Sequence, residues 1–438
     1  MKYFATIIAT LFTLSTYAQE YNIGKGGETA RMTITPYATA AEAEAANGAA
    51  VQNKYLRPIA DWAQTEEQDV TIYKSQFAYP FAWLNRLALI HIDAVWTAYE
   101  LYLNGKLVGN VTNGYAPAEF NVTSYVQDDM NSVEIRVAKT HWSQTLECFD
   151  NKKEVKQPNA YVFSQPVIRV RDITHKARVD ATGKMANVEV GLVVKTEALN
   201  PKKARIHYEL ISRDTTVIEH GYRDIYLEQK GEDTVKFMAR IPAKELWSID
   251  SPTLYKVNIK TQIEGRYAEY QSHSIGFREL TYEDKKLLIN GEKVELKISD
   301  VDAQTAQIDE LKRLKKGGFN SVRVIAGTAS ASFYQMCDAA GMYVVVVAPI
   351  NTSQSGTSRK VGGNPTNDIA WRTIYLDRTE SAYRTTCDYA SVVAYQLAQK
   401  SANGINLYES YLLLKELENE RPIIYPDSGK EWNNDVIE

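Results

Sequence analysis

The side chains that could do chemistry in this chain do not group into a familiar catalytic pattern. Its six histidines show no metal-ligand spacing, and its three cysteines, Cys148, Cys337 and Cys387, are far apart in the sequence. Neither a glycine-rich phosphate loop nor a Gly-x-Ser-x-Gly motif occurs. Asp302 and Asp309 form no catalytic carboxylate pair and are typical of residues that cap or solvate a helix. Any reactive group must therefore be placed by the fold, which the rest of the sequence has to supply.

The size and charge of the chain limit the classes of function. Its 438 residues suggest about three domains, with 44% hydrophobic and 24% charged residues, as in an ordinary globular protein. The net charge of -4 and the lack of any long basic run argue against a nucleic-acid partner.

The first residues resemble an export signal. Met1-Lys2 precedes a short apolar run, Tyr3–Leu14, and small residues lead to Ala18. This pattern predicts a signal peptide over residues 1–18, because the run is too short to span a bilayer. No later segment is apolar and long enough for a membrane span. We therefore expect an exported protein, soluble in the periplasm or outside the cell.

Two β-rich segments follow. Residues 19–166 alternate in short apolar runs, and Asn104-Gly105 between two such runs predicts a type I′ hairpin, since both residues tolerate positive φ. Many short strands with evenly spaced turns predict a β-sandwich. Residues 167–279 have the length and strand pattern of an immunoglobulin-like sandwich.

In the last segment, residues 280–438, the spacing of the apolar residues changes from a strand period to a helical one. Ile308, Leu311 and Leu314 recur at helical spacing, and the helix is expected to end at Gly317-Gly318. Apolar, β-branched runs alternate with such helices, which indicates βα units around a parallel sheet. The fold class expected is multidomain β plus α/β.

Landmarks in all three segments resemble glycoside hydrolase family 2, and β-galactosidases in particular. They include Leu101–Gly109, Pro117–Thr123, Leu246–Tyr255, Gly318–Arg323 and Glu431–Asn433, in the family's order. The resemblance implies a jelly-roll sugar-binding domain, an immunoglobulin-like domain and a TIM barrel. Only five of the eight strands of a complete barrel are recognised, at Val294–Lys297, Ser321–Ile325, Tyr343–Val347, Val392–Gln396 and Pro422–Tyr425. An incomplete barrel is therefore expected.

The resemblance also indicates where hydrolysis should occur. Retaining glycosidases use two carboxyl groups about 5–5.5 Å apart, an acid/base and a nucleophile. The family's acid/base segment, Trp-Ser-Leu-Gly-Asn-Glu, matches Tyr395–Lys400, which puts Lys400 in place of the glutamate and Gln399 in place of the asparagine. The nucleophile is expected several dozen residues further on, and the chain stops at Glu438. We therefore expect no catalytic residue in this chain.

At several positions where the family has ligand-binding residues, this chain has other residue types or leaves the role open. Asn351 and Ser353 occupy positions that hold a glutamate and a histidine, metal-linked in some members of the family, so neither a catalytic metal nor another cofactor is expected. Arg323 matches a family residue and is either a ligand contact or structural. Asp150 matches an aspartate that reaches the active site from the first domain, or is a solvated turn residue. The possible ligand-cleft residues are Asp150, Arg323, Asn351, Lys400, Asn403, Tyr425 and Trp432.

Three functions remain open. The leading hypothesis is a catalytically inactive relative that binds a glycan or a protein in carbohydrate metabolism. One alternative is half of a split β-galactosidase-type hydrolase, completed by a second chain; Lys400 opposes it, because a partner cannot restore a residue inside this chain. The other is a structural subunit of an exported complex, with a protein chain covering the open edge of the barrel.

Overall fold

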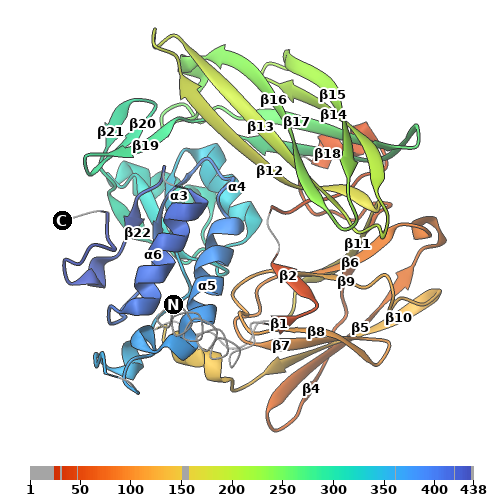
Figure 1. Ribbon diagram of the computed structural model, residues 1–438, viewed down its shortest axis with the longest axis horizontal. Helices are drawn as coiled ribbons and strands as arrows, with labels where there is room; N and C mark the ends of the chain where they lie inside the picture. Colours follow the sequence, from red (N-terminus) through yellow and green to blue (C-terminus); the bar gives the residue numbers. More distant parts are fainter. Residues whose placement is uncertain are drawn as a thin grey trace, which may run out of the picture.

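Three units follow one another along the chain in the computed structural model (Figure 1). The structure describes residues 24–29, 32–46, 48–149, 157–360, 362–418 and 420–435. The expected signal peptide, residues 1–18, and the predicted cleft residue Asp150 lie outside the described residues. Within them, no helix is long and apolar enough to cross a bilayer.

The first unit is a two-sheet jelly-roll sandwich. One sheet has the order β1-β8-β7-β10-β5-β4 and the other β2-β9-β6-β11-β3. Alternate side chains of both sheets fill the space between them, among them the fully buried Ile90, Leu101 and Phe120. The strands are β1 (Gly24–Lys25), β2 (Gly27–Thr29), β3 (Leu56–Ile59), β4 (Ala63–Glu66), β5 (Val70–Tyr79), β6 (Leu87–Ile92), β7 (Tyr99–Leu103), β8 (Lys106–Val111), β9 (Ala118–Asn121), β10 (Asp129–Ala138) and β11 (Ala160–Gln165).

The hairpin predicted at Asn104-Gly105 is confirmed. The two residues join β7 to β8 with φ of 51° and 75°, the left-handed region that a type I′ turn requires. The Asn104 side chain donates to the Tyr125 carbonyl oxygen at 3.0 Å, which ties the turn to the neighbouring loop.

The second unit is the predicted immunoglobulin-like sandwich. A three-stranded sheet, β12-β13-β16, faces a four-stranded sheet, β15-β14-β17-β18. Tyr208 and Phe237 stack between the sheets with ring centroids 4.0 Å apart. The strands are β12 (Ile168–Val179), β13 (Met185–Thr196), β14 (Lys202–Ile211), β15 (Val217–Leu227), β16 (Glu232–Pro242), β17 (Tyr255–Ile263) and β18 (Arg266–Ile275).

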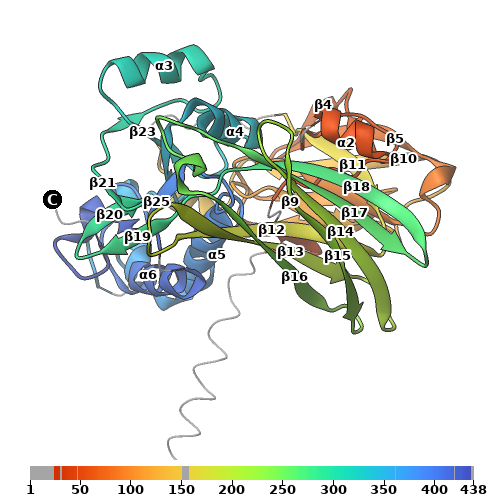
Figure 2. The same cartoon turned by 90° about the horizontal axis from the view of Figure 1, so that it is seen from above.

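The third unit contains a five-stranded parallel sheet in the sequential order β22-β23-β24-β25-β26. All five residues of β24 are buried, as expected for a strand covered on both faces. Figure 2 shows α3 at one end of this unit and α5 with α6 at the other. The elements are β22 (Ile298–Asp300), α3 (Ile308–Lys316), β23 (Ser321–Ile325), α4 (Ala331–Ala340), β24 (Tyr343–Val347), α5 (Arg372–Arg384), β25 (Val392–Gln396), α6 (Ile405–Leu417) and β26 (Ile423–Ile424).

The first parallel strand was predicted wrongly at Val294–Lys297. Val294 ends β21 (Glu292–Val294), which pairs with β20 (Lys286–Ile289) in a separate antiparallel sheet whose third strand is β19 (Leu280–Glu283). The turn at Asn290-Gly291 directs Val294 back against Leu287. Val294 is therefore paired with an antiparallel strand and does not join the parallel sheet. The parallel strand begins four residues later, at Ile298.

A fully buried ion pair joins the first unit to the third. Glu147, after β10, and Arg378, in α5, are both 0% exposed and in direct contact. Arg378 also donates to the carbonyl oxygens of Pro349 at 2.6 Å and Ser143 at 3.4 Å. Because a buried charge is tolerated only when it is paired and hydrogen-bonded, this pair fixes how the sandwich docks on α5.

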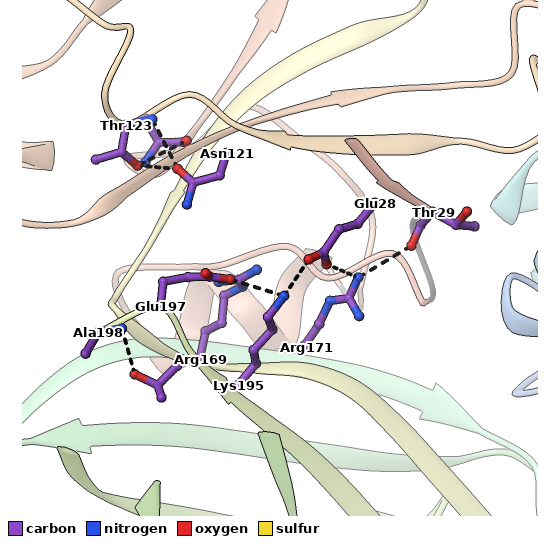
Figure 3. A network of polar contacts seen from close by, with 11 residues as sticks. Glu28, Thr29, Asn121, Thr123, Arg169, Arg171, Lys195, Glu197 and Ala198 are labelled. Carbon is purple, nitrogen blue, oxygen red and sulfur yellow. Dashed lines mark hydrogen bonds and ion pairs between the residues drawn. The ribbon is translucent and has the colours of Figure 1, made fainter. Parts of the chain in front are cut away.

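A partly exposed network joins the first unit to the second (Figure 3). Glu28 in β2 contacts Lys195 and Arg171 in the second unit, each at 2.6 Å. Burial alone would raise the pKa of Glu28, but the hydrogen bond from Lys195 and the charge of Arg171 bring that pKa below its usual value. Glu197 bonds both Lys195 and Arg169, so opposite charges alternate across the junction.

Removing one partner of the buried pair should destabilise the protein strongly. We expect Arg378→Met to lower the free energy of unfolding by about 3–5 kcal/mol, because Glu147 is left charged and unpaired in the interior. The matched control is Arg384→Met in the same helix, where the pair with Glu380 is more than a third exposed, and a loss of about 0.5 kcal/mol is expected. Urea unfolding followed by circular dichroism measures both, and equal losses would contradict the account.

Candidate functional site

A cavity of about 670 Å³ opens at the carboxyl ends of the parallel strands. This is the edge where residues that follow each strand converge, and where βα barrels place their sites. The third unit contributes residues at or after β22, β23, β25 and β26, and the jelly-roll contributes three aromatic residues. The lining includes Trp96, Tyr115, Phe149, Asp300, Asp302, Arg323, Gln396, Gln399, Lys400 and Asp427.

The aromatic wall is held by contact between the first and third units. Trp96 donates its indole N–H to the Gly327 carbonyl oxygen at 3.1 Å. Gly327 has a φ of 81°, and a Cβ there would lie 1.8 Å from the Tyr115 carbonyl oxygen, so only glycine fits. Tyr115 and Phe149 pack with ring centroids 5.7 Å apart. The wall therefore exists only while the sandwich is docked on the loop after β23.

The polar part of the cavity is organised by Arg323. Its guanidinium donates to both oxygens of Asp300, at 2.7 and 2.9 Å, and to the side-chain oxygen of Gln396 at 3.4 Å. The hydrogen bond to Asp300 raises the pKa of Arg323. Two guanidinium N–H groups thus hold the Asp300 carboxylate in a bidentate contact, so Arg323 fixes the position of Asp300.

Lys400 lies at the mouth of the cavity, four residues after β25 ends at Gln396. The Gln399 backbone N–H donates to the Ile350 carbonyl oxygen at 2.9 Å, which anchors the segment to the loop after β24. Lys400 itself has a φ of 47° and an exposed side chain. The structure thus brings three of the sequence-predicted residues, Arg323, Gln399 and Lys400, to one cavity.

Asn351 and Asn403 are placed elsewhere. Asn351 is buried, and its side-chain oxygen accepts from the Ser353 backbone N–H at 3.0 Å. Asn403 and Asn433 exchange two amide hydrogen bonds of 2.9 Å, a reciprocal pair that is also buried. Neither Asn351 nor Asn403 lines the cavity, because the side-chain amides of both are hydrogen-bonded inside the protein.

Tyr425 and Trp432 also lie away from the cavity. Tyr425 is fully buried and donates its hydroxyl to the Ser401 carbonyl oxygen at 2.7 Å. Trp432 is 56% exposed and stacks on Tyr408 in α6, with ring centroids 5.3 Å apart. These two residues hold the segment after β26 in place and do not face a ligand in the cavity.

Most of the cavity wall was not predicted from the sequence. Trp96 and Tyr115 lie in loops of the sandwich, more than 200 residues before β25, and no local pattern connects them to it. Gln396 was recognised only as the end of a strand, although the carboxyl end of a parallel strand is the signal that could have identified it. Among the described residues, no group of three or more His, Cys, Asp or Glu side chains is arranged to hold a metal ion.

Comparison with known proteins identifies the family. Residues 41–164 match the model of the sugar binding domain of glycosyl hydrolases family 2 and residues 280–438 that of its TIM barrel domain. Residues 168–278, between them, match the model described as glycosyl hydrolases family 2. The chain belongs to glycoside hydrolase family 2.

The chain is similar to bacterial β-galactosidases. It is 24% identical over 376 residues to one from Psychromonas ingrahamii, covering 82% of this chain and 36% of that protein. It is also 24% identical over 396 residues to one from Streptococcus thermophilus, covering 86% and 37%. The chain thus spans little more than a third of the length of these curated relatives.

Solved structures show the same fold. A β-glucuronidase from Bacteroides uniformis superposes with a TM-score of 0.67 and 16% identity, covering 82% of this chain and 46% of that one. A β-D-glucuronidase from Dictyoglomus thermophilum superposes with a TM-score of 0.68 and 16% identity, covering 86% and 73%.

The backbone at Lys400 generates a testable prediction. A φ of 47° disfavours β-branched residues and is tolerated by asparagine. We expect Lys400→Val to cost about 1–2 kcal/mol of stability and Lys400→Asn to cost much less, although both remove the ammonium group. Urea unfolding of the two variants measures the difference. Equal stabilities would contradict the positive-φ turn.

Proposed function

We propose that this chain binds the sugar residues of a β-linked glycan in the cavity at the carboxyl ends of β22–β26 and does not hydrolyse them. The observation that carries the proposal is Lys400 on the cavity wall, at the position where the family resemblance places the acid/base glutamate. The cavity's volume, about 670 Å³, lies within the usual range of about 300–1,000 Å³ for ligand sites.

The lining suits a sugar. Trp96, Tyr115 and Phe149 offer aromatic surface to the C–H groups of a pyranose ring. Gln396 and Gln399 present amide groups that both donate and accept hydrogen bonds, which matches the hydroxyl groups of a carbohydrate. The similarity to β-galactosidases supports a β-linked glycan as the ligand class.

The lining does not suit hydrolysis. Retention requires one carboxyl group to give a proton to the leaving oxygen and then take one from water. Lys400 brings an ammonium group on a flexible stem in place of that carboxyl. Asp300 is held by Arg323, and Asp302 accepts the Gln304 backbone N–H at 3.1 Å as a turn cap. We therefore infer binding without turnover.

Two assays on the same protein test this function. We expect no release of nitrophenol above the buffer rate from nitrophenyl β-galactoside or β-glucuronide. We expect calorimetry to detect binding of at least one of these glycosides, and Arg323→Met to weaken it about tenfold or more, since a charged donor is lost. Arg313→Met, an exposed change in α3, is the matched control and should bind as the unchanged protein does.

Two results would overturn the proposal. One is turnover by the unchanged protein above the buffer rate, and loss of that turnover in Lys400→Met would identify Lys400 as a working acid or base. The other is binding that Arg323→Met leaves intact, which would put the glycan outside this cavity.

We also propose that the chain is exported, on the pattern of Met1-Lys2, the apolar run and Ala18. The expected outcome is a secreted or periplasmic protein whose first residue is Gln19. Amino-terminal sequencing of the protein from its native host measures this, and a mature protein that retains Met1 would contradict it.

A further inference from the structure

The outer face of the four-stranded sheet of the second unit carries exposed tyrosines. Residues of β14 that point inward, such as Ile206 and Tyr208, are buried in the core, so the alternate residues face outward. Tyr222 and Tyr226 in β15 and Tyr267 in β18 are 49%, 54% and 51% exposed. We call this the tyrosine face: Tyr222, Tyr226, Tyr267 and the outward residues between them. Its strands are drawn in green in Figure 1.

Rings on this face form a continuous row across the sheet. Tyr222 in β15 contacts His207 in β14, with centroids 5.6 Å apart. His207 contacts Tyr267 at 5.5 Å, and Tyr267 contacts Tyr270 at 5.8 Å. The row therefore runs from one edge strand of the sheet to the other, because β15 and β18 are its two edges.

Two pairs of opposite charges on the tyrosine face neutralise each other, and Lys203 adds one exposed cation. Arg205 donates to both oxygens of Asp224, at 2.6 and 2.9 Å, and Lys260 pairs with Glu209 at 3.1 Å. A charged ligand would have to compete with these pairs. A neutral ligand does not compete with these ion pairs, and its hydroxyl groups can still donate to the free lone pairs of the carboxylates.

A hollow of about 470 Å³ lies beside the ring row. It is lined by Lys203, Arg205, Asp224, Tyr226 and Gln262, among others. These side chains place hydrogen-bond donors and acceptors next to an aromatic ring, the combination that suits a ligand with both C–H faces and hydroxyl groups.

Of the residues that the structure describes, those outside the sandwich cover only one end of this face. Helix α2 (Ala40–Ala46) lies beside β18 (Figure 2), and its Glu44 accepts from the amide of Asn258 in β17 at 3.2 Å. The backbone of Tyr37 pairs with that of Tyr270. Tyr222, Tyr226 and Tyr267 stay exposed beyond this cover.

We propose that the tyrosine face is a second glycan-binding surface, for a neutral polysaccharide chain whose pyranose rings stack on Tyr222, Tyr226 and Tyr267. A protein partner fits less well, because protein interfaces are centred on a desolvated, charge-depleted core. Here the ion pair Arg205–Asp224 lies among the rings. The surface is separate from the cavity and does not depend on the function proposed for it.

Affinity electrophoresis in native gels tests the proposal. The probes are two neutral β-linked polysaccharides, pectic galactan and hydroxyethyl cellulose, and one anionic polysaccharide, polygalacturonate. We expect at least one neutral gel to retard the unchanged protein. The triple variant Tyr222→Ala, Tyr226→Ala, Tyr267→Ala should bind at least about tenfold more weakly, since three stacking contacts are lost.

Two controls keep the test specific. Phe81→Ala removes an aromatic ring that is 85% exposed on the first unit and should leave retardation unchanged. Arg323→Met is added both to the unchanged protein and to the triple variant, and the drop in retardation between these two is expected to persist, which separates this surface from the cavity. If the triple variant does not fold, Tyr226→Ala and Tyr267→Ala, measured singly, should each weaken retardation.

The proposal is overturned by any of three results. These are no retardation in either neutral gel, equal retardation of the tyrosine variants and the unchanged protein, and retardation by polygalacturonate alone. The absence of retardation in both neutral gels would favour a protein as the ligand of the tyrosine face.

Discussion

The buried contact between Glu147 and Arg378 is the constraint on which the cavity depends. The aromatic half of the cavity comes from the jelly-roll and the polar half from the parallel sheet, so the two units must dock in one register. An ion pair with no solvent exposure enforces that register, because any shift would leave two charges unpaired in the interior. The backbone supports the same docking: the Asn351 N–H donates to the Leu146 carbonyl oxygen at 2.7 Å, next to Glu147.

Docking then determines what the carboxyl edge of the parallel sheet can do. Because Gly327 has no Cβ, the Tyr115 backbone packs directly against it, and the Trp96 indole N–H donates to the Gly327 carbonyl oxygen. The sandwich therefore closes one side of the site. Arg323 organises the other side through Asp300 and Gln396. Lys400 adds a cation at the mouth, where the family resemblance calls for a carboxyl group that exchanges protons. Under the function we propose, this arrangement holds a sugar without the proton relay that hydrolysis needs.

Local signals in the sequence predicted the elements well. The Asn104-Gly105 turn, the helix through Leu311 and the buried valine run of β24 each follow from residue type and period, which act within a few residues. The strand at Val294 was wrong, because the antiparallel hairpin with Leu287 competes for it and periodicity cannot rank the two pairings. The wall residue Trp96 was missed, since its role is set by a tertiary contact 231 residues away.

The candidate site was predicted in part for the same reason. Matching Tyr395–Lys400 to a family segment put Lys400 just after a barrel strand, and in the structure it follows β25 and lines the cavity. Asn403 and Tyr425 matched family segments too, yet they are buried in internal hydrogen bonds. A motif match identifies a position in the fold, while the direction of a side chain depends on its packing.

Nuclear magnetic resonance on the protein mixed with a β-galactosyl disaccharide tests the central claim most directly. We expect saturation transfer from the protein to the galactosyl ring protons, with the disaccharide intact after prolonged incubation. Anomeric signals of free galactose that grow with time would contradict it, as would the absence of any saturation transfer.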